Sequence, residues 1–183
     1  MRRFIWASTY AAGGLAAGCL SAFLMIQNAG LEPVVAGGPW QSRQAALSGP
    51  SAFYARAHYM LAGRVPPAPG QIIEAAAETD DGGQPLRVTC TYRLTAQEPL
   101  PAWWSLSTEA GGTADAGMQA TVESNTVIRA ADGSLTIMAS APPAPGNWLK
   151  LPEQRRISLL YTALSPAPAV TAAPFTITRE GCS

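Results

Sequence analysis

Residues 86–95 read LRVTCTYRLT, and this stretch decides the fold because apolar and polar side chains alternate along its whole length. One set of alternate positions carries Leu86, Val88, Cys90, Tyr92 and Leu94. Arginines and threonines fill the positions between them. A period of two places the first set on one face of a β-strand and the second set on the other. One buried face and one hydrated face are typical of an antiparallel sheet.

Short apolar segments on both sides of this stretch predict further strands. They cover residues 71–79, 102–109, 125–129, 134–140, 157–164 and 175–178. The turn sequences Asp80-Asp81-Gly82-Gly83 and Ala131-Asp132-Gly133 are typical of β-hairpins. Residues 51–62 show helical spacing, with Ser51 as the N-cap. Six or seven strands and one short helix predict a mainly-β domain, an antiparallel, jelly-roll-like β-sandwich.

The amino terminus predicts a transmembrane helix. Arg2 and Arg3 precede an uncharged run from Phe4 to Ile26, which as a helix is about 34 Å long and can cross a bilayer. Three interpretations compete: a signal-anchor with its arginines in the cytoplasm, a lipoprotein signal ending at Cys19, and a cleaved signal peptide. The apolar run continues past Cys19, which favours the anchor.

The chain therefore divides into three predicted parts. Residues 1–27 form the signal-anchor, residues 28–50 a stalk or an arm laid on the domain, and residues 51–183 the β-sandwich. The expected location is the inner membrane of a bacterium, with the carboxyl-terminal domain in the periplasm. Twelve basic residues balance twelve acidic ones, which argues against a nucleic-acid partner because such proteins carry a basic patch.

The cysteines fit an exported domain. Cys19 falls in the apolar run, which leaves Cys90 and Cys182 as an even pair. In an oxidising compartment such a pair predicts a disulfide. A bridge over about 90 residues contributes around 4 kcal/mol in the chain-entropy model. The alternative is that Cys90 is a buried apolar residue and Cys182 a free thiol in the tail.

Several motifs along the chain carry a family resemblance. In order they are Gly38-Pro39-Trp40, Cys90-Thr91-Tyr92-Arg93, Trp103-Trp104-Ser105-Leu106, Asp132-Gly133-Ser134-Leu135-Thr136-Ile137 and Gly146-Asn147-Trp148-Leu149. Over roughly residues 38–182 the chain resembles the bacterial domain-of-unknown-function family numbered 1214, in its small membrane-anchored form. The most specific matches are Trp40, Trp104, Asp132, Gly133, Asn147 and Trp148.

The resemblance implies one hydrophobic segment followed by an all-β, jelly-roll-like domain, and no established activity. The chain departs from the family pattern at two places. Residues 107–110 replace a Thr-x-Tyr-Asp stretch, and Leu160 stands before Tyr161 where the family tends to have an arginine. A polar site that other members build from these positions is therefore not expected in this chain.

Catalytic groups are scarce in the sequence. His58 is the single histidine, which excludes a two-histidine metal site, and no acid is spaced to reach it. We expect no catalytic residue, no metal and no cofactor. Glu74 and Glu78 are the carboxylates of the alternative function, an enzyme or enzyme subunit acting on envelope polysaccharide. Asp80 and Asp81 are expected to form a hairpin tip rather than a calcium site.

Arg87, Arg93 and Trp103 form the candidate binding face. The two arginines share the polar face of strand 86–95. Trp103 belongs to the next predicted strand, on the face opposite to that of Trp104. If the two strands pair, the tryptophan lies near both arginines, and such a surface stacks on sugar rings or anchors a protein. Alternatively, an arginine or the helix over 51–62 covers Trp103.

The function that we expect from the sequence is therefore a non-enzymatic binding or scaffolding module of the cell envelope. Its partners would be the membrane and an envelope protein or glycan. A further hypothesis is a purely structural accessory of a membrane complex.

Overall fold

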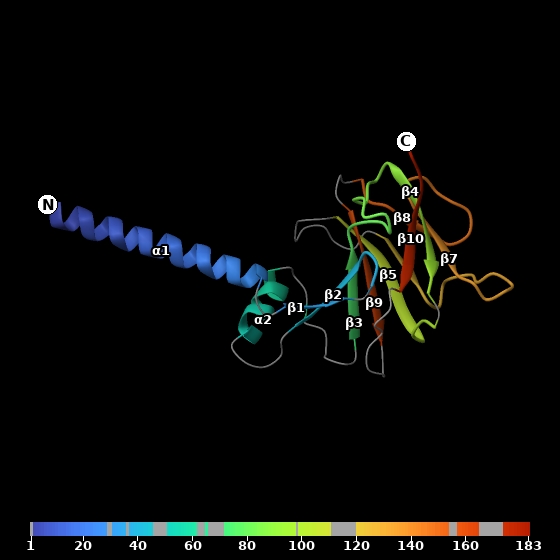
Figure 1. The fold of residues 1–183 in the computed structure, drawn as a ribbon, viewed down its shortest axis with the longest axis horizontal. Helices are drawn as coiled ribbons and strands as arrows, with labels where there is room; N and C mark the ends of the chain where they lie inside the picture. The colour runs from blue at the N-terminus through green and yellow to red at the C-terminus, as the bar shows by residue number, and fades with distance from the viewer. Residues whose placement is uncertain are drawn as a thin grey trace. The chain divides into compact units, whose positions relative to one another are not determined.

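The computed structural model describes residues 2–28, 31–35, 37–45, 51–61, 65, 72–97, 99–110, 120–153, 157–164 and 174–183. The chain forms two compact units (Figure 1). The first consists of Met1–Glu32 and Ala45–Pro66, and the second of Pro33–Gln44 and Pro67–Ser183.

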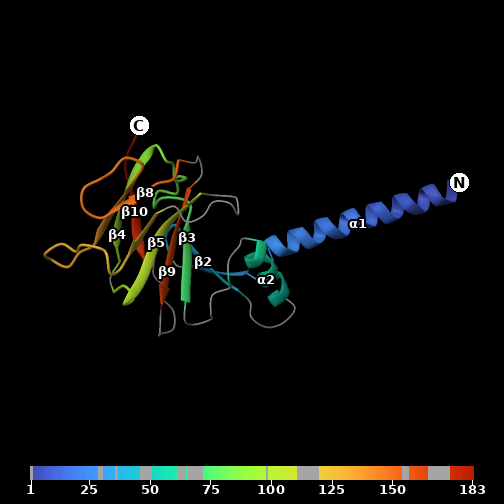
Figure 2. The same cartoon turned by 180° about the vertical axis from the view of Figure 1, so that it is seen from behind.

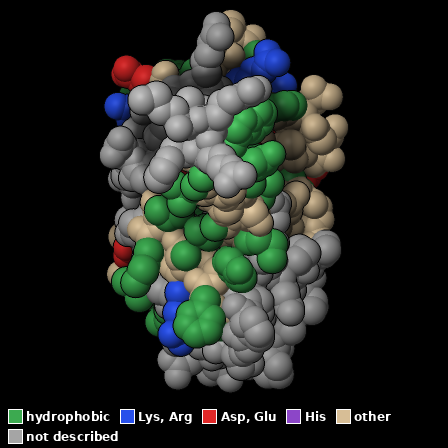
Figure 3. All heavy atoms as spheres, turned by 90° about the vertical axis from the view of Figure 1, so that its left-hand side faces the viewer, with side chains coloured by type: hydrophobic (Ala, Val, Ile, Leu, Met, Phe, Trp, Pro, Cys, Tyr) green, Lys and Arg blue, Asp and Glu red, His purple; other side chains and the backbone are tan. Residues whose placement is uncertain are grey.

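The first unit contains the two helices, α1 (Arg2–Asn28) and α2 (Ser51–Leu61). Within α1, the segment Trp6–Ile26 is long and apolar enough to cross a membrane. In the space-filling view of Figure 3, hydrophobic side chains gather on the face turned toward the viewer. The large exposed hydrophobic side chains on α1 are Trp6, Tyr10, Leu15, Leu20, Phe23, Leu24 and Met25. These properties fit a membrane anchor or a signal sequence.

Helix α2 confirms the helix predicted over 51–62. Ala55 and Tyr59 are buried together, whereas Phe53 and Met60 are exposed. The side chain of His58 lies outside the described residues. By contact, this helix belongs to the first unit, although the sequence assigned it to the same domain as the strands.

The larger sheet of the fold has six strands. They are β1 (Leu31–Val35), β2 (Trp40–Ala45), β3 (Ile72–Ala77), β9 (Ile157–Leu164), β5 (Trp103–Ala110) and β6 (Ala120–Glu123), in this spatial order. The pairs from β2 to β6 are antiparallel. Strands β1 and β2 fall in the stretch predicted as a stalk or arm, and β2 is hydrogen-bonded to β3.

The smaller sheet has four strands. They are β10 (Phe175–Cys182), β4 (Cys90–Ala96), β7 (Thr136–Ser140) and β8 (Trp148–Lys150), in this spatial order. Strand β4 pairs antiparallel with both β10 and β7, whereas β7 and β8 run parallel. The views in Figure 1 and Figure 2 show the strands of the two sheets as separate groups.

The hydrophobic core lies between the two sheets. Trp104 from the larger sheet packs edge-to-face on Phe175 from the smaller sheet, with ring centroids 5.4 Å apart. Trp40 is fully buried, and its indole Nε1 donates a hydrogen bond to the Phe175 carbonyl at 2.6 Å. Tyr161 lies within 6.4 Å of the Trp40 and Trp104 rings. The mainly-β sandwich is therefore confirmed, with one parallel pair that the sequence did not predict.

The deciding stretch, 86–95, behaves as predicted in its core face but not over its full length. Leu86, Cys90, Tyr92 and Leu94 are all buried. The strand itself begins at Cys90, because residues 87–89 form a turn in which the Cys90 amide donates to the Arg87 carbonyl.

The acidic turn over 80–83 is a corner between the two sheets. Thr79 and Pro85 form an antiparallel bridge, and the Asp80 amide donates to the Gln84 carbonyl, as in a hairpin. However, β3 and β4 belong to different sheets. The predicted hairpin is therefore limited to the turn and its one bridge, and it does not pair β3 with β4.

The strand predicted over 125–129 is absent. Residues 124–126 form a turn, and residues 127–130 follow it without strand pairing. The strand in this region is β6, at Ala120–Glu123. In place of a paired strand, a side chain hydrogen-bonds the backbone of Ile128, as described below.

Candidate functional site

The three residues of the predicted binding face lie apart. Arg93 stands on the outer face of β4 in the smaller sheet, and Arg87 precedes β4 in the turn. Trp103 begins β5 in the larger sheet. Because β4 and β5 do not pair, the structure does not bring Trp103 beside the two arginines.

Trp103 belongs instead to an apolar row across the outer face of the larger sheet. Ile72, Leu164 and Trp103 are in register on β3, β9 and β5. Leu164 is 46% exposed and Trp103 is 36% exposed. The neighbours of the tryptophan along this row are therefore aliphatic.

Arg93 forms an ion pair across the smaller sheet. Its Nε donates to an oxygen of Glu180 on β10. The hydrogen bond and the charge of Glu180 raise the pKa of Arg93, so the guanidinium stays protonated. Its cross-strand neighbours are Thr178 on β10 and Met138 on β7.

A groove of about 340 Å³ lies beside Arg93 on the outer face of the smaller sheet. Residues from β4 and β7 and from the loops before β7 and before β8 line it. They are Arg93, Ile128, Arg129, Ala130, Ser134, Thr136, Met138, Pro145, Gly146 and Asn147. This lining contains two arginines and no carboxylate, which makes the groove our candidate functional site.

Asn147 builds one wall of this groove. Its Oδ1 accepts from the Ile128 amide at 2.8 Å, and its Nδ2 donates to the Ile128 carbonyl at 2.7 Å. The same Nδ2 donates to the Thr136 carbonyl at 2.9 Å. The side-chain amide thus bonds Ile128 as a neighbouring strand would, and leaves its side chain 73% exposed.

The Asp132-Gly133 turn holds the other end of this wall. Gly133 adopts a φ of 82°, which a residue with a side chain adopts only with strain. Its carbonyl accepts from Nη1 of Arg129 at 2.9 Å. Asp132 Oδ1 accepts from the Ser134 amide at 2.9 Å, and hydrogen bonds from Ser134 lower the pKa of Asp132. Two motifs of the family resemblance therefore shape one groove.

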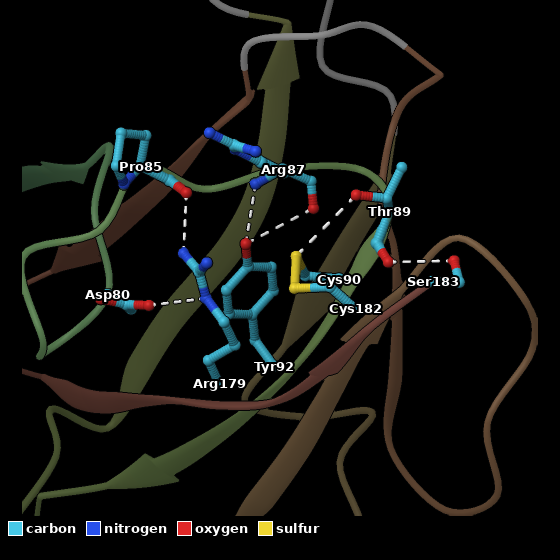
Figure 4. Close-up of a disulfide and its surroundings, with 9 residues drawn as sticks. All are labelled: Asp80, Pro85, Arg87, Thr89, Cys90, Tyr92, Arg179, Cys182 and Ser183. Atoms are coloured by element: carbon cyan, nitrogen blue, oxygen red, sulfur yellow. Dashed lines mark hydrogen bonds and ion pairs between the residues drawn. A yellow bond between two sulfur atoms is a disulfide. The ribbon is translucent and has the colours of Figure 1, made fainter.

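The predicted disulfide between Cys90 and Cys182 is present, with an S–S distance of 2.00 Å (Figure 4). It joins the first residue of β4 to the last of β10. Beside it, Tyr92 Oη accepts from the Arg87 amide at 2.7 Å. The Arg87 backbone thus belongs to a structural corner, and its side chain is exposed.

The acidic turn contributes to the same corner. Arg179 pairs with Asp80 at 2.8 Å, donates to the Pro85 carbonyl and lies over the Tyr92 ring (Figure 4). Asp81 Oδ2 accepts from the Ile177 amide at 2.7 Å. Both aspartates therefore fasten the turn to β10. Within the described parts of the chain, no three His, Cys, Asp or Glu side chains gather in a group that could hold a metal ion.

Of the carboxylates named for the alternative function, Glu74 lies on β3 and Glu78 directly follows that strand. A third carboxylate, Glu123, which was not among those predicted, shares one row of the outer face of the larger sheet with Glu74, through Thr162 and Ser105. Three strand spacings separate them by about 14 Å. Glu74 and Glu78 are separated by about 13 Å along an extended chain.

Ile128, Arg129 and Met138 are groove residues that sequence reasoning missed. The signal for Met138 was available, because the period of two in residues 134–140 places it on the hydrated face with Thr136. Ile128 and Arg129 had no such signal, since their place depends on the distant Asn147. Trp148 is adjacent to Met138 across the β7–β8 pair, and its indole donates to the Ser140 carbonyl at 3.1 Å.

Two solved structures share similarity with the chain. VPA0106 from Vibrio parahaemolyticus has a TM-score of 0.56 and 18% sequence identity over 73% of this chain and 36% of its own. An uncharacterized protein from Burkholderia cenocepacia has a TM-score of 0.48 and 22% identity over 87% of this chain and 39% of its own. The chain therefore spans little more than a third of the length of either protein. The similarity to VPA0106 supports the fold and nothing beyond it.

No curated protein matches the chain significantly. Residues 71–168 match the family described as "Protein of unknown function (DUF1214)". This segment is more than half of the chain and contains β3 to β9 and every residue that lines the groove. The chain therefore belongs to the DUF1214 family.

Proposed function

We propose that this chain is a membrane-anchored binding module of the bacterial cell envelope, with its β-sandwich in the periplasm. The observation that carries the proposal is the groove beside Arg93. Its walls are fixed by Asn147 and by the Asp132-Gly133 turn, and its lining combines apolar side chains with two guanidinium groups. A concave, largely pre-formed site of this kind is typical of small-molecule binding.

Two further observations support the proposed location. The apolar helix α1 has the length of a membrane anchor. The Cys90–Cys182 disulfide joins β4 to the edge strand β10 at one end of their antiparallel pair, and structural disulfides persist in oxidising compartments such as the periplasm.

The proposed activity is binding without turnover. The aspartates of the acidic turn are used in structural bonds, and the lining of the groove holds no carboxylate to act as an acid or a base. The groove offers cations and apolar surface, which bind and orient a ligand.

A methyl-resolved binding screen tests this proposal. The full chain, with its methionine methyl groups labelled with carbon-13, is placed in nanodiscs of phosphatidylcholine and screened against a library of small acids, bases and neutral compounds. Met138 lines the groove, whereas Met60 stands exposed on α2 and serves as the internal control. We expect a subset of compounds to shift the Met138 resonance alone and to be recovered unchanged. A Met138 resonance that responds to no compound, or chemical conversion of a bound compound, would contradict the proposal.

A further inference from the structure

The charge of the groove selects its ligand. Arg93 and Arg129 both line it, and the lining holds no aspartate or glutamate. Charge-assisted hydrogen bonds from arginine favour a carboxylate or a phosphate over a neutral group. A cation, in contrast, would meet two like charges.

The remainder of the lining selects for an apolar body attached to that acid. Ile128, Met138 and Pro145 present hydrocarbon or thioether surface, and Ile128 is largely exposed because Asn147 fixes its backbone. Burying apolar ligand surface here contributes about 25 cal/mol per Å². The volume of about 340 Å³ is at the small end of ligand sites, so it fits one small molecule.

Glu180 is a built-in competitor for this acid. Its carboxylate accepts from Arg93 Nε, but Glu180 does not line the groove. The side chains of Arg93 and Glu180 are 49% and 39% exposed, and exposed ion pairs are weak because water and salt screen them. An acidic ligand can therefore replace Glu180 at small cost.

Arg129 is positioned by the turn that follows it. Its Nη1 donates to the Gly133 carbonyl, and the turn is closed by bonds from Gly133 to Ala130 and from Ala130 to Ser134. The guanidinium is thus held at the groove wall before any ligand arrives, which lowers the entropic cost of binding.

We propose that the groove binds a small amphiphile that carries one carboxylate or phosphate on an apolar chain. The acid contacts Arg93 and Arg129, and the chain lies against Ile128 and Met138. The inference rests on the proposed function and names its ligand class. A free acid and the headgroup of an anionic lipid present the same chemistry.

The test compares four probes that share one alkyl chain: octanoate, octyl phosphate, octanol and octyltrimethylammonium. Each is titrated into the full chain in phosphatidylcholine nanodiscs, and the Met138 methyl shift is read against Met60. We expect the two anions to bind at least about tenfold more tightly than octanol, and the cation more weakly still. Nanodiscs doped with phosphatidylglycerol distinguish the sources, because a headgroup ligand shifts Met138 without added probe.

Charge variants sharpen the test. Arg93→Gln and Arg129→Gln should each weaken octanoate binding by about threefold to tenfold, with octanol affinity unchanged. Glu180→Gln should strengthen octanoate binding by about threefold, because Arg93 then loses its competing carboxylate. Lys150→Gln removes a charge from the same sheet outside the lining, and should leave octanoate affinity unchanged.

Equal affinity for octanoate and octanol would overturn the ligand class, as would an octanoate affinity that is unchanged in all three groove variants. The proposed function would survive either result if neutral compounds still shift Met138. It would fail if no compound in the library does so. Since Glu180 is exposed and outside the core, Glu180→Gln keeps the test open even if an arginine variant folds poorly.

Discussion

Asn147 acts at the scale of a single residue, and it explains why a predicted strand is absent. Residues 125–129 resemble a strand because they include three consecutive β-branched residues, and Ile128 is indeed hydrogen-bonded through both its amide and its carbonyl. The partner is a side-chain amide from 19 residues further along the chain. The local pattern of residues predicts a strand here, but it cannot show which group pairs with the backbone.

Asn147→Ala should therefore lower the free energy of unfolding by about 2 kcal/mol, because it leaves three backbone groups without their amide partner. Asn125→Ala, at an exposed position in the preceding turn, is the matched control and should change stability by less than about 0.5 kcal/mol. Urea unfolding followed by circular dichroism measures both. Equal effects of the two substitutions would contradict the stabilising role of the Asn147 side-chain amide.

The lowered pKa of Asp132 predicts that the stability of the fold depends on pH. Its pKa in the folded protein lies below the ordinary value of 3.8 because Ser134 hydrogen-bonds to it. A lowered pKa stabilises the fold above that ordinary value, and the contribution disappears as the pH falls through the folded-state pKa. At about pH 7, the wild-type protein should therefore unfold at a higher urea concentration than Asp132→Asn. This difference between the two unfolding midpoints should shrink towards about pH 3. A constant difference would show that charge is not involved.

Strand β10 shows at the scale of an element how an edge is closed. The Ile177 amide donates to Asp81 Oδ2, and the Ile177 carbonyl accepts from the Asp81 amide. The Phe175 carbonyl accepts from Trp40. Without these partners, the backbone groups of β10 could hydrogen-bond to a strand of another molecule, and the protein would then self-associate. The sequence indicated the turn at Asp80-Asp81, but not that the turn seals an edge 96 residues away.

Asp81→Ala should open this edge. We expect stability to fall by about 1–2 kcal/mol and self-association to appear at rising protein concentration. Glu78→Ala, at an exposed position just before the turn, controls for loss of negative charge. Sedimentation velocity of the detergent-solubilised chain reports both variants. An Asp81→Ala protein that stays as monomeric as the control would contradict the role of this aspartate.

The disulfide is the element-scale feature that the sequence predicted best, because an even pair of cysteines in an exported domain leaves few arrangements. It closes a loop over a separation of 92 residues. Cys182→Ser should destabilise the sandwich by about 4–5 kcal/mol in the chain-entropy model. Cys19→Ser is the matched control, since Cys19 stands exposed on α1. If the two variants unfold at the same urea concentration, the bridge contributes nothing.

At the scale of the whole molecule, the sequence predicted the class of fold but not the partners of its strands. Alternation is local, so the core faces of 86–95 and 157–164 could be read directly. Sheet membership is set by contacts between distant residues: residues 28–50 were predicted as a stalk or an arm laid on the domain, and Trp40 within them is buried against Tyr161 and Phe175. For the same reason Trp103 and Arg93 were expected together and lie on different sheets.

We propose that the disulfide-linked β-sandwich is tethered on the periplasmic side of the membrane. Thiol trapping in living cells tests it most directly: cells are quenched in acid, and thiols are alkylated with a mass tag before and after reduction. In a Cys19→Ser background, we predict no tag before reduction and tags on both Cys90 and Cys182 after it, in protein that stays with the membrane on carbonate extraction. Two tags added before reduction would place the domain in a reducing compartment and contradict the account.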